Sequence, residues 1–328
     1  MRIAINGFGR IGRMLTRELT DRKNVELVAV NDLSDPATLL HLYKYDSIHG
    51  SRKEGSVLTK NGFQISGQNI AVFNEKNPSN LPWRDLNIDI VVESTGLFRD
   101  REGAGKHLSA GAKKVILSAP PKSEDIKSVC LGINEDILDG SEDIISNASC
   151  TTNSAAPLVK VMRTLTTIEA AYITTIHSYT GDQRLHDTPH NDLRRARAGA
   201  VSIVPTTTGA AKAITKIFPD LGDVMGGCGI RVPVPDGSLT DMTFIVKNAL
   251  SIEEINNAFK KASQTDLKGI LEYTEDPVVS VDVQGNKHSC VFDSLLTSSI
   301  GKMVKVMGWY DNEIGYSARL ADLIEKHH

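Results

Sequence analysis

A single cysteine stands among hydroxyl-bearing residues just ahead of a helix-like segment. Cys150 follows Ser149 and precedes two threonines, and the segment 155–165 is compatible with a helix in spite of its early Pro157. At or near a helix start, the positive end of the helix dipole lowers the pKa of a thiol and stabilises the thiolate. The neighbouring hydroxyl groups either cap the helix or provide donors for anions. Cys150 is therefore a candidate nucleophile for an aldehyde, and the alternative is an ordinary buried thiol.

A histidine further along the chain is a candidate base. His177 closes the run 171–176, which predicts a strand with an imidazole at its end. The pKa of an unperturbed imidazole suits proton exchange near neutral pH. Spacing alone does not place His177 beside Cys150, so a purely structural hydrogen-bonding role stays open.

A glycine-rich turn follows the first predicted strand. The strand 2–6 runs into Gly7, Gly9 and Gly12, which form the pattern G-x-G-x-x-G where a helix is predicted to begin. Gly7 permits the tight turn, Gly9 lets the backbone approach a pyrophosphate, and Gly12 lets helix and strand pack closely. The N–H groups and positive dipole end of the helix favour phosphates. Glycine-rich turns also occur for conformational reasons alone.

An acidic residue at the end of the second predicted strand supports a dinucleotide site at this turn. Asp32 ends the second predicted strand 20 residues after Gly12, where a carboxylate can accept hydrogen bonds from the adenosine ribose. The same charge repels a ribose 2′-phosphate, and Leu33 and Ser34 supply no arginine to offset it. The sequence therefore predicts NAD rather than NADP as cofactor. The alternative for Asp32 is a solvated residue in a turn.

Composition narrows the classes of partner. The chain has 328 residues and a net charge of −3, so no overall field favours nucleic acid or an anionic membrane. Its four cysteines show neither C-x-x-C pairs nor zinc-finger spacing, which argues against a metal site and a disulfide framework. We see no stretch of about 20 apolar residues and no signal-peptide pattern, and we therefore expect a cytoplasmic protein.

The predicted elements indicate two domains of α/β type. Short apolar runs at 2–6, 25–31, 88–93 and 114–118 read as strands, with a helix at 11–22, which predicts a Rossmann-type, doubly wound parallel sheet. Runs at 171–176, 241–247, 278–282 and 304–310 predict a second α+β domain on a mixed or antiparallel sheet. We expect an NAD-binding domain at 1–149, completed by a C-terminal helix at 314–328, and a catalytic and oligomerisation domain at 150–313.

Several long segments together resemble the glyceraldehyde-3-phosphate dehydrogenase family. They include INGFGRIGR, SNASCTTN, TTIHSYTGDQ, DLRRARAGAVSIVPTTTGAAKA, RVPVPDGS and WYDNEIGYS, and they span nearly the whole chain in order. The resemblance implies the two-domain fold of that family, usually a homotetramer, and a role in glycolysis or gluconeogenesis. It also implies the phosphorylating, NAD-dependent oxidation of glyceraldehyde 3-phosphate to 1,3-bisphosphoglycerate.

The resemblance implies a role for each candidate residue. Cys150 is the nucleophile that forms a thiohemiacetal and then a thioester, and His177 is the base that activates it. The family pattern places two anions, the substrate phosphate and the attacking inorganic phosphate, among hydroxyl groups, arginines and a backbone N–H group. Thr180 and Arg231 bind the first anion, Arg195 assists between the two, and the second anion is lined by Ser149, Thr151, Thr208 and Gly209. The matching cofactor positions are Gly7, Gly9, Arg10, Ile11, Asp32, Lys76, Ser118 and Asn312, with Asn312 bonded to the nicotinamide amide.

Some of these residues could instead have purely structural roles. Arg194 and Arg197 are expected to form salt bridges, which is also the alternative for Arg195, and Thr208 with Gly209 could cap the helix 210–217. Lys76 stands where the family often has arginine. Ser154 replaces a frequent second cysteine, and Ile314 replaces a frequent tryptophan. Leu33 and Pro189 resemble the pair seen in NAD-preferring members, in agreement with the charge of Asp32.

Two other functions compete with this interpretation. Erythrose-4-phosphate dehydrogenase uses the same thiol chemistry without obligatory phosphorolysis, but the retained TGDQ and TTTGAAKA segments disfavour it. A non-catalytic NAD-binding or RNA-binding relative is disfavoured because Cys150 and His177 are both present and the charge is near neutral. We therefore expect small-molecule substrates and no obligatory nucleic acid or membrane partner.

Overall fold

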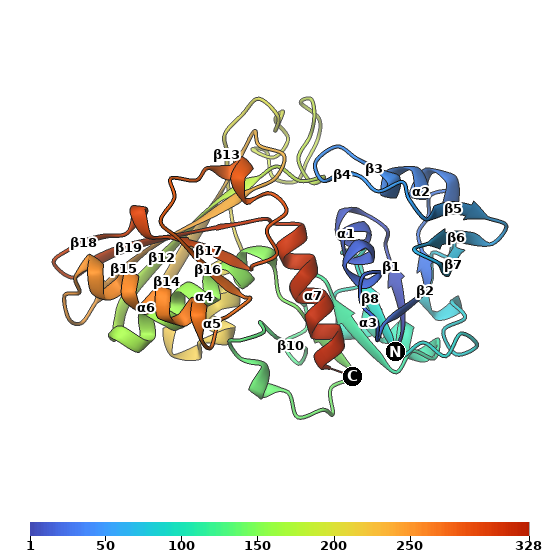
Figure 1. Ribbon diagram of the computed structural model, residues 1–328, viewed down its shortest axis with the longest axis horizontal. Coiled ribbons are helices and arrows are strands. Elements are labelled where there is room, and N and C mark those ends of the chain that lie inside the picture. The colour runs from blue at the N-terminus through green and yellow to red at the C-terminus, as the bar shows by residue number, and fades with distance from the viewer. Residues whose placement is uncertain (328) are drawn as a thin grey trace. The chain divides into compact units, whose positions relative to one another are not determined.

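The computed structural model describes residues 1–327, and contacts divide the chain into two compact units (Figure 1). The first unit holds Met1–Val129, Glu135–Ala148 and the residues from Ser317 onward. The second holds Cys130–Asn134 and Ser149–Tyr316. His328, the last residue of the predicted segment 314–328, lies outside the described residues. The domain boundaries that the sequence suggests stay a prediction.

The first unit is built on a nine-stranded sheet that is parallel from β10 to β7 and ends in an antiparallel hairpin. β1 lies at its centre, with β2 on one side and β8 on the other, so the winding reverses there; such switch points carry ligand sites at the strands' carboxyl ends. The predicted doubly wound sheet is confirmed. In spatial order the strands are β10 (Lys127–Ser128), β11 (Ile144–Ser146), β9 (Lys114–Leu117), β8 (Ile90–Glu93), β1 (Arg2–Asn6), β2 (Glu26–Asn31), β7 (Gln68–Phe73), β6 (Gly62–Ile65) and β5 (Ser56–Thr59).

Apolar runs account for the burial of this sheet. The central strands present side chains with almost no exposed surface, including Ile3, Ile5 and Val92, because a parallel sheet covered on both faces requires apolar residues in succession. Its helices are α1 (Arg10–Leu19), α2 (Pro36–Lys44), α3 (Arg101–Ser109) and most of α7 (Ile314–Lys326), and the strands β3 (Tyr45–Asp46) and β4 (Gly50–Ser51) form a small separate ribbon. Leu320, Leu323 and Ile324 on α7 are buried, as the spacing predicts.

The second unit contains an eight-stranded mixed sheet, which confirms the predicted class. The helices α4 (Cys150–Leu165), α5 (Ala210–Ile217) and α6 (Ile252–Gln264) contact its strands from one side (Figure 1). β12 pairs in parallel with β14 and antiparallel with β15. The strand order is β13 (Val204–Thr206), β14 (Met225–Val232), β12 (Ile168–Ser178), β15 (Ser238–Val246), β19 (Met303–Tyr310), β17 (Cys290–Asp293) and β16 (Leu271–Thr274), and β18 (Ser298–Ile300) pairs with β19.

One predicted strand is wrong. The run 278–282 has the apolar composition of a strand, but Ser280–Val283 forms a 3₁₀ turn. The carboxylate of Asp282 accepts the N–H of Val279 at 2.7 Å, and the N–H of Asp282 bonds to the carbonyl of Val279 at 3.0 Å. The aspartate therefore closes the backbone locally, as short polar side chains do in turns. Among residues 1–327, no helix combines the length and the apolar character that crossing a bilayer requires.

Candidate functional site

The candidate nucleophile is the first residue of a helix. α4 begins at Cys150, and Ser149 caps it by accepting the N–H of Thr152 on its side-chain oxygen at 3.0 Å. Ala148 has a φ of 53°, a conformation uncommon for residues other than glycine, at the turn that leads into α4. The first-turn N–H groups of a helix have no partner within it, so those of Cys150 and Thr151 can serve an anion at the sulfur.

The candidate base lies beside this thiol. The Sγ atom of Cys150 is 3.4 Å from Nε2 of His177, and His177 is 6% exposed near the end of β12. Nδ1 of His177 is 2.7 Å from the carbonyl oxygen of Ser178. The Ser178 carbonyl oxygen only accepts, whereas the Arg231 nitrogen 2.6 Å from the same Nδ1 only donates, so the two contacts call for opposite tautomers. In the tautomer with its proton on Nδ1, the lone pair of Nε2 faces the thiol. The pair thus has the contact needed for proton transfer from sulfur to nitrogen.

Burial and a neighbouring guanidinium group both lower the pKa of this base. Strand register pairs His177 with Arg231, and an Arg231 nitrogen lies 2.6 Å from Nδ1 of His177 and donates to the carbonyl of Ser178 at 3.1 Å. Burial, followed by the charge of Arg231, lowers the pKa of His177 to about 3. The imidazole is therefore neutral near pH 7, although the same shift makes it a weaker base than an ordinary imidazole.

The thiol experiences opposing influences. Burial raises the pKa of Cys150, whereas the positive charge of Arg231 and the hydrogen bonds of Thr151 lower it. The thiol therefore keeps its proton until a carbonyl carbon is attacked, and the adjacent imidazole nitrogen receives that proton. This arrangement is suited to addition of sulfur to an aldehyde with His177 as general base.

The other predicted anion-binding residues lie on neighbouring segments of the second unit. Thr180 donates its N–H and hydroxyl to the side-chain oxygen of Gln183, at 2.8 and 3.1 Å. Arg195 donates to Asp182 at 2.7 Å and to Thr206 at 2.9 Å, so its charge is partly neutralised. Arg195 therefore forms the salt bridge that was its alternative role. Arg197 also forms a salt bridge, with Asp187 at 2.7 Å.

Thr208 and Gly209 stand at the start of α5. Gly209 is the N-terminal cap without a side-chain bond, and the hydroxyl of Thr208 accepts the N–H of Ala210 at 3.2 Å. Thr208 also lines a hollow of about 510 Å³ together with residues of β13, β14 and the segment 192–194. An added Cβ on Gly209 would meet nothing within 4 Å, so its backbone is open to a ligand.

The glycine turn of the first unit fits a dinucleotide. Gly7 has a φ of 96°, and a Cβ there would lie 2.8 Å from backbone atoms of Ser94 and Thr95. A Cβ on Gly12 would lie 2.2 Å from the carbonyl oxygen of Gly7. A Cβ on Gly9, in contrast, would touch nothing within 4 Å, so the backbone at the start of α1 is open where a pyrophosphate would approach.

The acidic residue at the end of β2 adjoins this turn. Asp32 accepts the N–H of Phe8 at 2.8 Å and the N–H of Ser34 at 2.9 Å. It is only partly buried, so its remaining lone pairs can accept from ribose hydroxyl groups. The guanidinium of Arg10 binds Asp46 at 2.5 and 3.1 Å.

The remaining predicted cofactor residues have simpler surroundings. Ile11 is half-buried and Lys76 is exposed, while the hydroxyl of Ser118 donates to the carbonyl of Glu93 at 3.1 Å. Asn312 belongs to the second unit, where its Oδ1 accepts the hydroxyls of Ser178 and Ser238, each at 2.8 Å.

Sequence reasoning missed a buried polar cluster beside the glycine turn. The carboxylate of Glu93, 2% exposed at the end of β8, accepts from Asn6 at 2.6 Å, from His107 at 3.1 Å, and from the N–H and hydroxyl of Thr95. Trp83 donates to Nδ1 of His107 at 3.0 Å, which places the other ring proton toward Glu93. The sequence did contain a signal for Glu93, because an acidic residue at the end of an apolar strand is the same pattern that pointed to Asp32.

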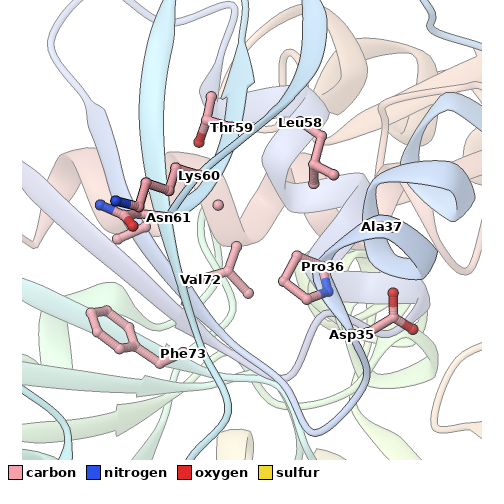
Figure 2. A pocket seen from close by; sticks show the side chains of 11 residues that line it. Asp35, Pro36, Ala37, Leu58, Thr59, Lys60, Asn61, Val72 and Phe73 are labelled. Carbon is pink, nitrogen blue, oxygen red and sulfur yellow. The ribbon is translucent and has the colours of Figure 1, made fainter.

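The first unit also has a cavity, which none of the predicted cofactor residues line. Figure 2 shows this pocket of about 660 Å³, with Pro36 and Val72 pointing into it and with Lys60 and Asp35 at its borders. It is lined by residues from α2, β5, β6 and β7 and from the turns beside them. Asp32 does not line this hollow, although its N–H bonds to the carbonyl of Phe73, which does.

Comparison with known proteins agrees with both halves of the chain. The family model "Glyceraldehyde 3-phosphate dehydrogenase, C-terminal domain" matches residues 149–312, and "Glyceraldehyde 3-phosphate dehydrogenase, NAD binding domain" matches residues 1–101. The chain is 53% identical over 327 residues to glyceraldehyde-3-phosphate dehydrogenase of Thermotoga maritima, covering 99% of this chain and 98% of the relative. It is 50% identical over 325 residues to the Geobacillus stearothermophilus enzyme, covering 98% and 97%. The chain therefore belongs to the glyceraldehyde-3-phosphate dehydrogenase family of NAD-dependent oxidoreductases.

Proposed function

We propose that Cys150 and His177 carry out the phosphorylating oxidation of glyceraldehyde 3-phosphate in this chain. The observation that carries the proposal is the 3.4 Å contact between the thiol sulfur and Nε2 at the start of α4. The family membership supplies the substrate class, and the neutral imidazole supplies a proton acceptor in the required position.

The proposed chemistry follows from these contacts. As the sulfur of Cys150 forms a bond to the aldehyde carbon, its proton passes to Nε2 of His177, and the carbonyl electron pair becomes an alkoxide. The N–H of Cys150 and the protonated imidazole can donate to that oxygen. When bound, NAD supplies the hydride acceptor that turns the thiohemiacetal into a thioester. Attack by an inorganic phosphate oxygen then breaks the carbon–sulfur bond, returns the thiolate and releases 1,3-bisphosphoglycerate.

Two groups of residues are proposed to hold the anions. Arg231 and Thr180 bind the phosphate of the substrate, with Arg195 between the two sites. Arg231 is already adjacent to the base, so a phosphate bound to it lies close to the reacting carbon. Hydroxyl and N–H groups at the starts of α4 and α5 offer donors to the attacking phosphate. These are Ser149, Thr151, Thr208 and Gly209.

The first unit is proposed to hold NAD through its glycine turn. The open backbone at Gly9 and the start of α1 suit the pyrophosphate, and Asp32 suits the ribose hydroxyls. Gly7, Arg10, Ile11, Lys76 and Ser118 complete the proposed set in this unit, and Asn312 belongs to it from the second unit. On this basis we assign 1–149 and the segment 314–328 to cofactor binding and 150–313 to catalysis and oligomerisation.

We also propose a homotetramer in the cytoplasm. The segment between β12 and β13 exposes 74% of Leu185, 81% of Leu193 and 80% of Val201. Tyr172 on β12 is half exposed, on the opposite side of the strand from the buried Ile173. Apolar surface of this extent is typical of an interface between subunits. Light scattering should give a mass about four times the 35.6 kDa of one chain.

The test of the function is an absorbance assay with each reactant left out in turn. NADH should form only when NAD, glyceraldehyde 3-phosphate and inorganic phosphate are all present, apart from an initial burst without phosphate as the thioester accumulates. Erythrose 4-phosphate should be a poor substitute. Turnover that is independent of phosphate, or faster with erythrose 4-phosphate, would reject the proposed reaction.

A further inference from the structure

One buried tyrosine contacts Thr151, the residue after Cys150, and the ring of His177. Tyr310 ends β19 and is 1% exposed. Its hydroxyl oxygen lies 2.9 Å from the hydroxyl of Thr151 on α4 and 3.0 Å from the hydroxyl of Thr175 on β12. Its ring meets the imidazole of His177 edge-on, with centroids 6.0 Å apart and planes inclined at 78°. The side chain thus joins the helix that carries the nucleophile to the strand that carries the base.

The phenol group remains a hydrogen-bond donor at every working pH. Burial and the nearby Cys150 raise the pKa of Tyr310 above its ordinary value, although the hydroxyls of Thr151 and Thr175 oppose the change. The ionisable groups around it are Cys150 on α4, His177 on β12 and Arg231 on β14. A phenol proton is also donated more readily than that of an aliphatic hydroxyl, because the phenol is more acidic.

The direction of the hydrogen bonds follows from counting protons. Either oxygen can donate in the contacts of Tyr310 with Thr151 and Thr175. A threonine hydroxyl has one proton, so Thr151 accepts from Tyr310 only when its own proton is directed elsewhere, and the sulfur of the preceding residue, Cys150, is the acceptor that a thiolate provides. The oxygen of Thr151 is then free to accept the proton of Tyr310. The oxygen of Tyr310 in turn accepts from Thr175. All three O–H dipoles therefore point toward the sulfur, and bonds in such a chain strengthen one another.

We propose that Tyr310 is a positioning residue that directs the hydroxyl of Thr151 at the sulfur of Cys150 and holds the ring of His177 edge-on beside it. The inference rests on the proposed role of Cys150 as nucleophile. It adds a group that touches no reactant and acts through Thr151 and His177. In the thioester stage the same orientation presents the hydroxyl of Thr151 to the incoming phosphate.

The test is the pH dependence of thiol alkylation in the full-length Tyr310→Phe variant. Iodoacetamide reacts with the thiolate and needs neither substrate nor cofactor. We expect the midpoint of the alkylation profile to rise by about half a pH unit, and the rate below the midpoint to fall about threefold, since one hydrogen bond to an anion is weakened. Thr175→Val should shift the midpoint in the same direction by a smaller amount, and kcat/KM should fall in both variants.

Tyr273→Phe is the matched control, because this residue lies on β16, two strands from β19, where its ring stacks on Phe292. It should leave the alkylation profile unchanged. Circular dichroism and NAD binding will report whether each variant is folded. A folded Tyr310→Phe protein whose alkylation midpoint matches that of the wild type refutes the proposal, even if its melting temperature falls. Absence of NADH formation by the wild type would instead reject the underlying function.

Discussion

The ion pair between Arg10 and Asp46 offers a quantitative test of the start of α1. Arg10 binds both carboxylate oxygens of Asp46, whose side chain has no exposed surface. The N–H groups of Ile48 and His49 donate to the same carboxylate, at 3.0 and 2.9 Å. Asp46→Asn keeps the shape of the protonated carboxyl group but removes its charge. It therefore isolates the contribution of the ionised form.

The size of the effect follows from the pKa. Burial alone would raise the pKa of Asp46, but the hydrogen bonds from Arg10, His49 and Ile48 lower it from 3.8 to about 2. A carboxyl group with a depressed folded-state pKa stabilises the fold above its unfolded pKa, and this contribution disappears as pH falls through the folded value. The difference corresponds to about 2 kcal/mol at pH 7 and about 1 kcal/mol at pH 3.

Thermal unfolding checks this expectation. Asp46→Asn should lower the melting temperature by about 4 to 6 °C at pH 7, and about half as much at pH 3. Glu26→Gln is the control, because Glu26 is 54% exposed in its 2.7 Å pair with Arg2, and exposed pairs contribute about 0.5 kcal/mol or less. An Asp46→Asn effect that equals the control, or that grows as pH falls, would refute the reasoning.

Three further substitutions test the proposed sites. Cys150→Ser should abolish NADH formation while NAD titration gives an unchanged Kd; normal turnover would remove Cys150 from the mechanism. His177→Asn should slow both turnover and iodoacetamide alkylation at pH 7 by about a hundredfold or more, and an unaltered alkylation rate would contradict its role as base. Glu93→Gln should raise the Kd for NAD about tenfold while alkylation of Cys150 stays normal, because the loop after β8 loses a charged acceptor. A wild-type Kd in a calorimetric titration would limit Glu93 to a structural role.

The features predicted best from the sequence are those formed by residues that follow one another directly along the chain. A cap, a cysteine and a helix-compatible segment succeed one another, and α4 begins at Cys150. The glycine turn likewise lies between β1 and α1, where Gly7 and Gly12 leave no room for a Cβ. The strand expected at 278–282 failed because apolar composition alone does not reveal a carboxylate that closes the backbone into a turn.

Side-chain contacts between paired strands could not be predicted in this way. Arg231 lies beside His177 because β14 pairs in parallel with β12 in one particular register, and a shift of one residue would turn its side chain to the other face. Nothing in the local pattern of either strand specifies that register. The family resemblance supplied the role of Arg231 in binding phosphate, but its effect on the charge of the base emerges only from the distance between the two side chains.

The residues that sequence reasoning missed share a physical property. Glu93 and Tyr310 are buried polar groups whose partners lie far away along the chain: Thr151 is separated from Tyr310 by 159 positions, and Asn6 from Glu93 by 87. A buried polar atom must find a partner or incur a desolvation cost, so several elements have to arrive together before such a residue is tolerated. These residues are consequently placed where elements converge, which is also where strand ends and helix starts bring reactive groups together. Because their partners come from distant segments, these residues cannot be predicted from local sequence. For the same reason they are suited to hold in place the residues that contact substrate.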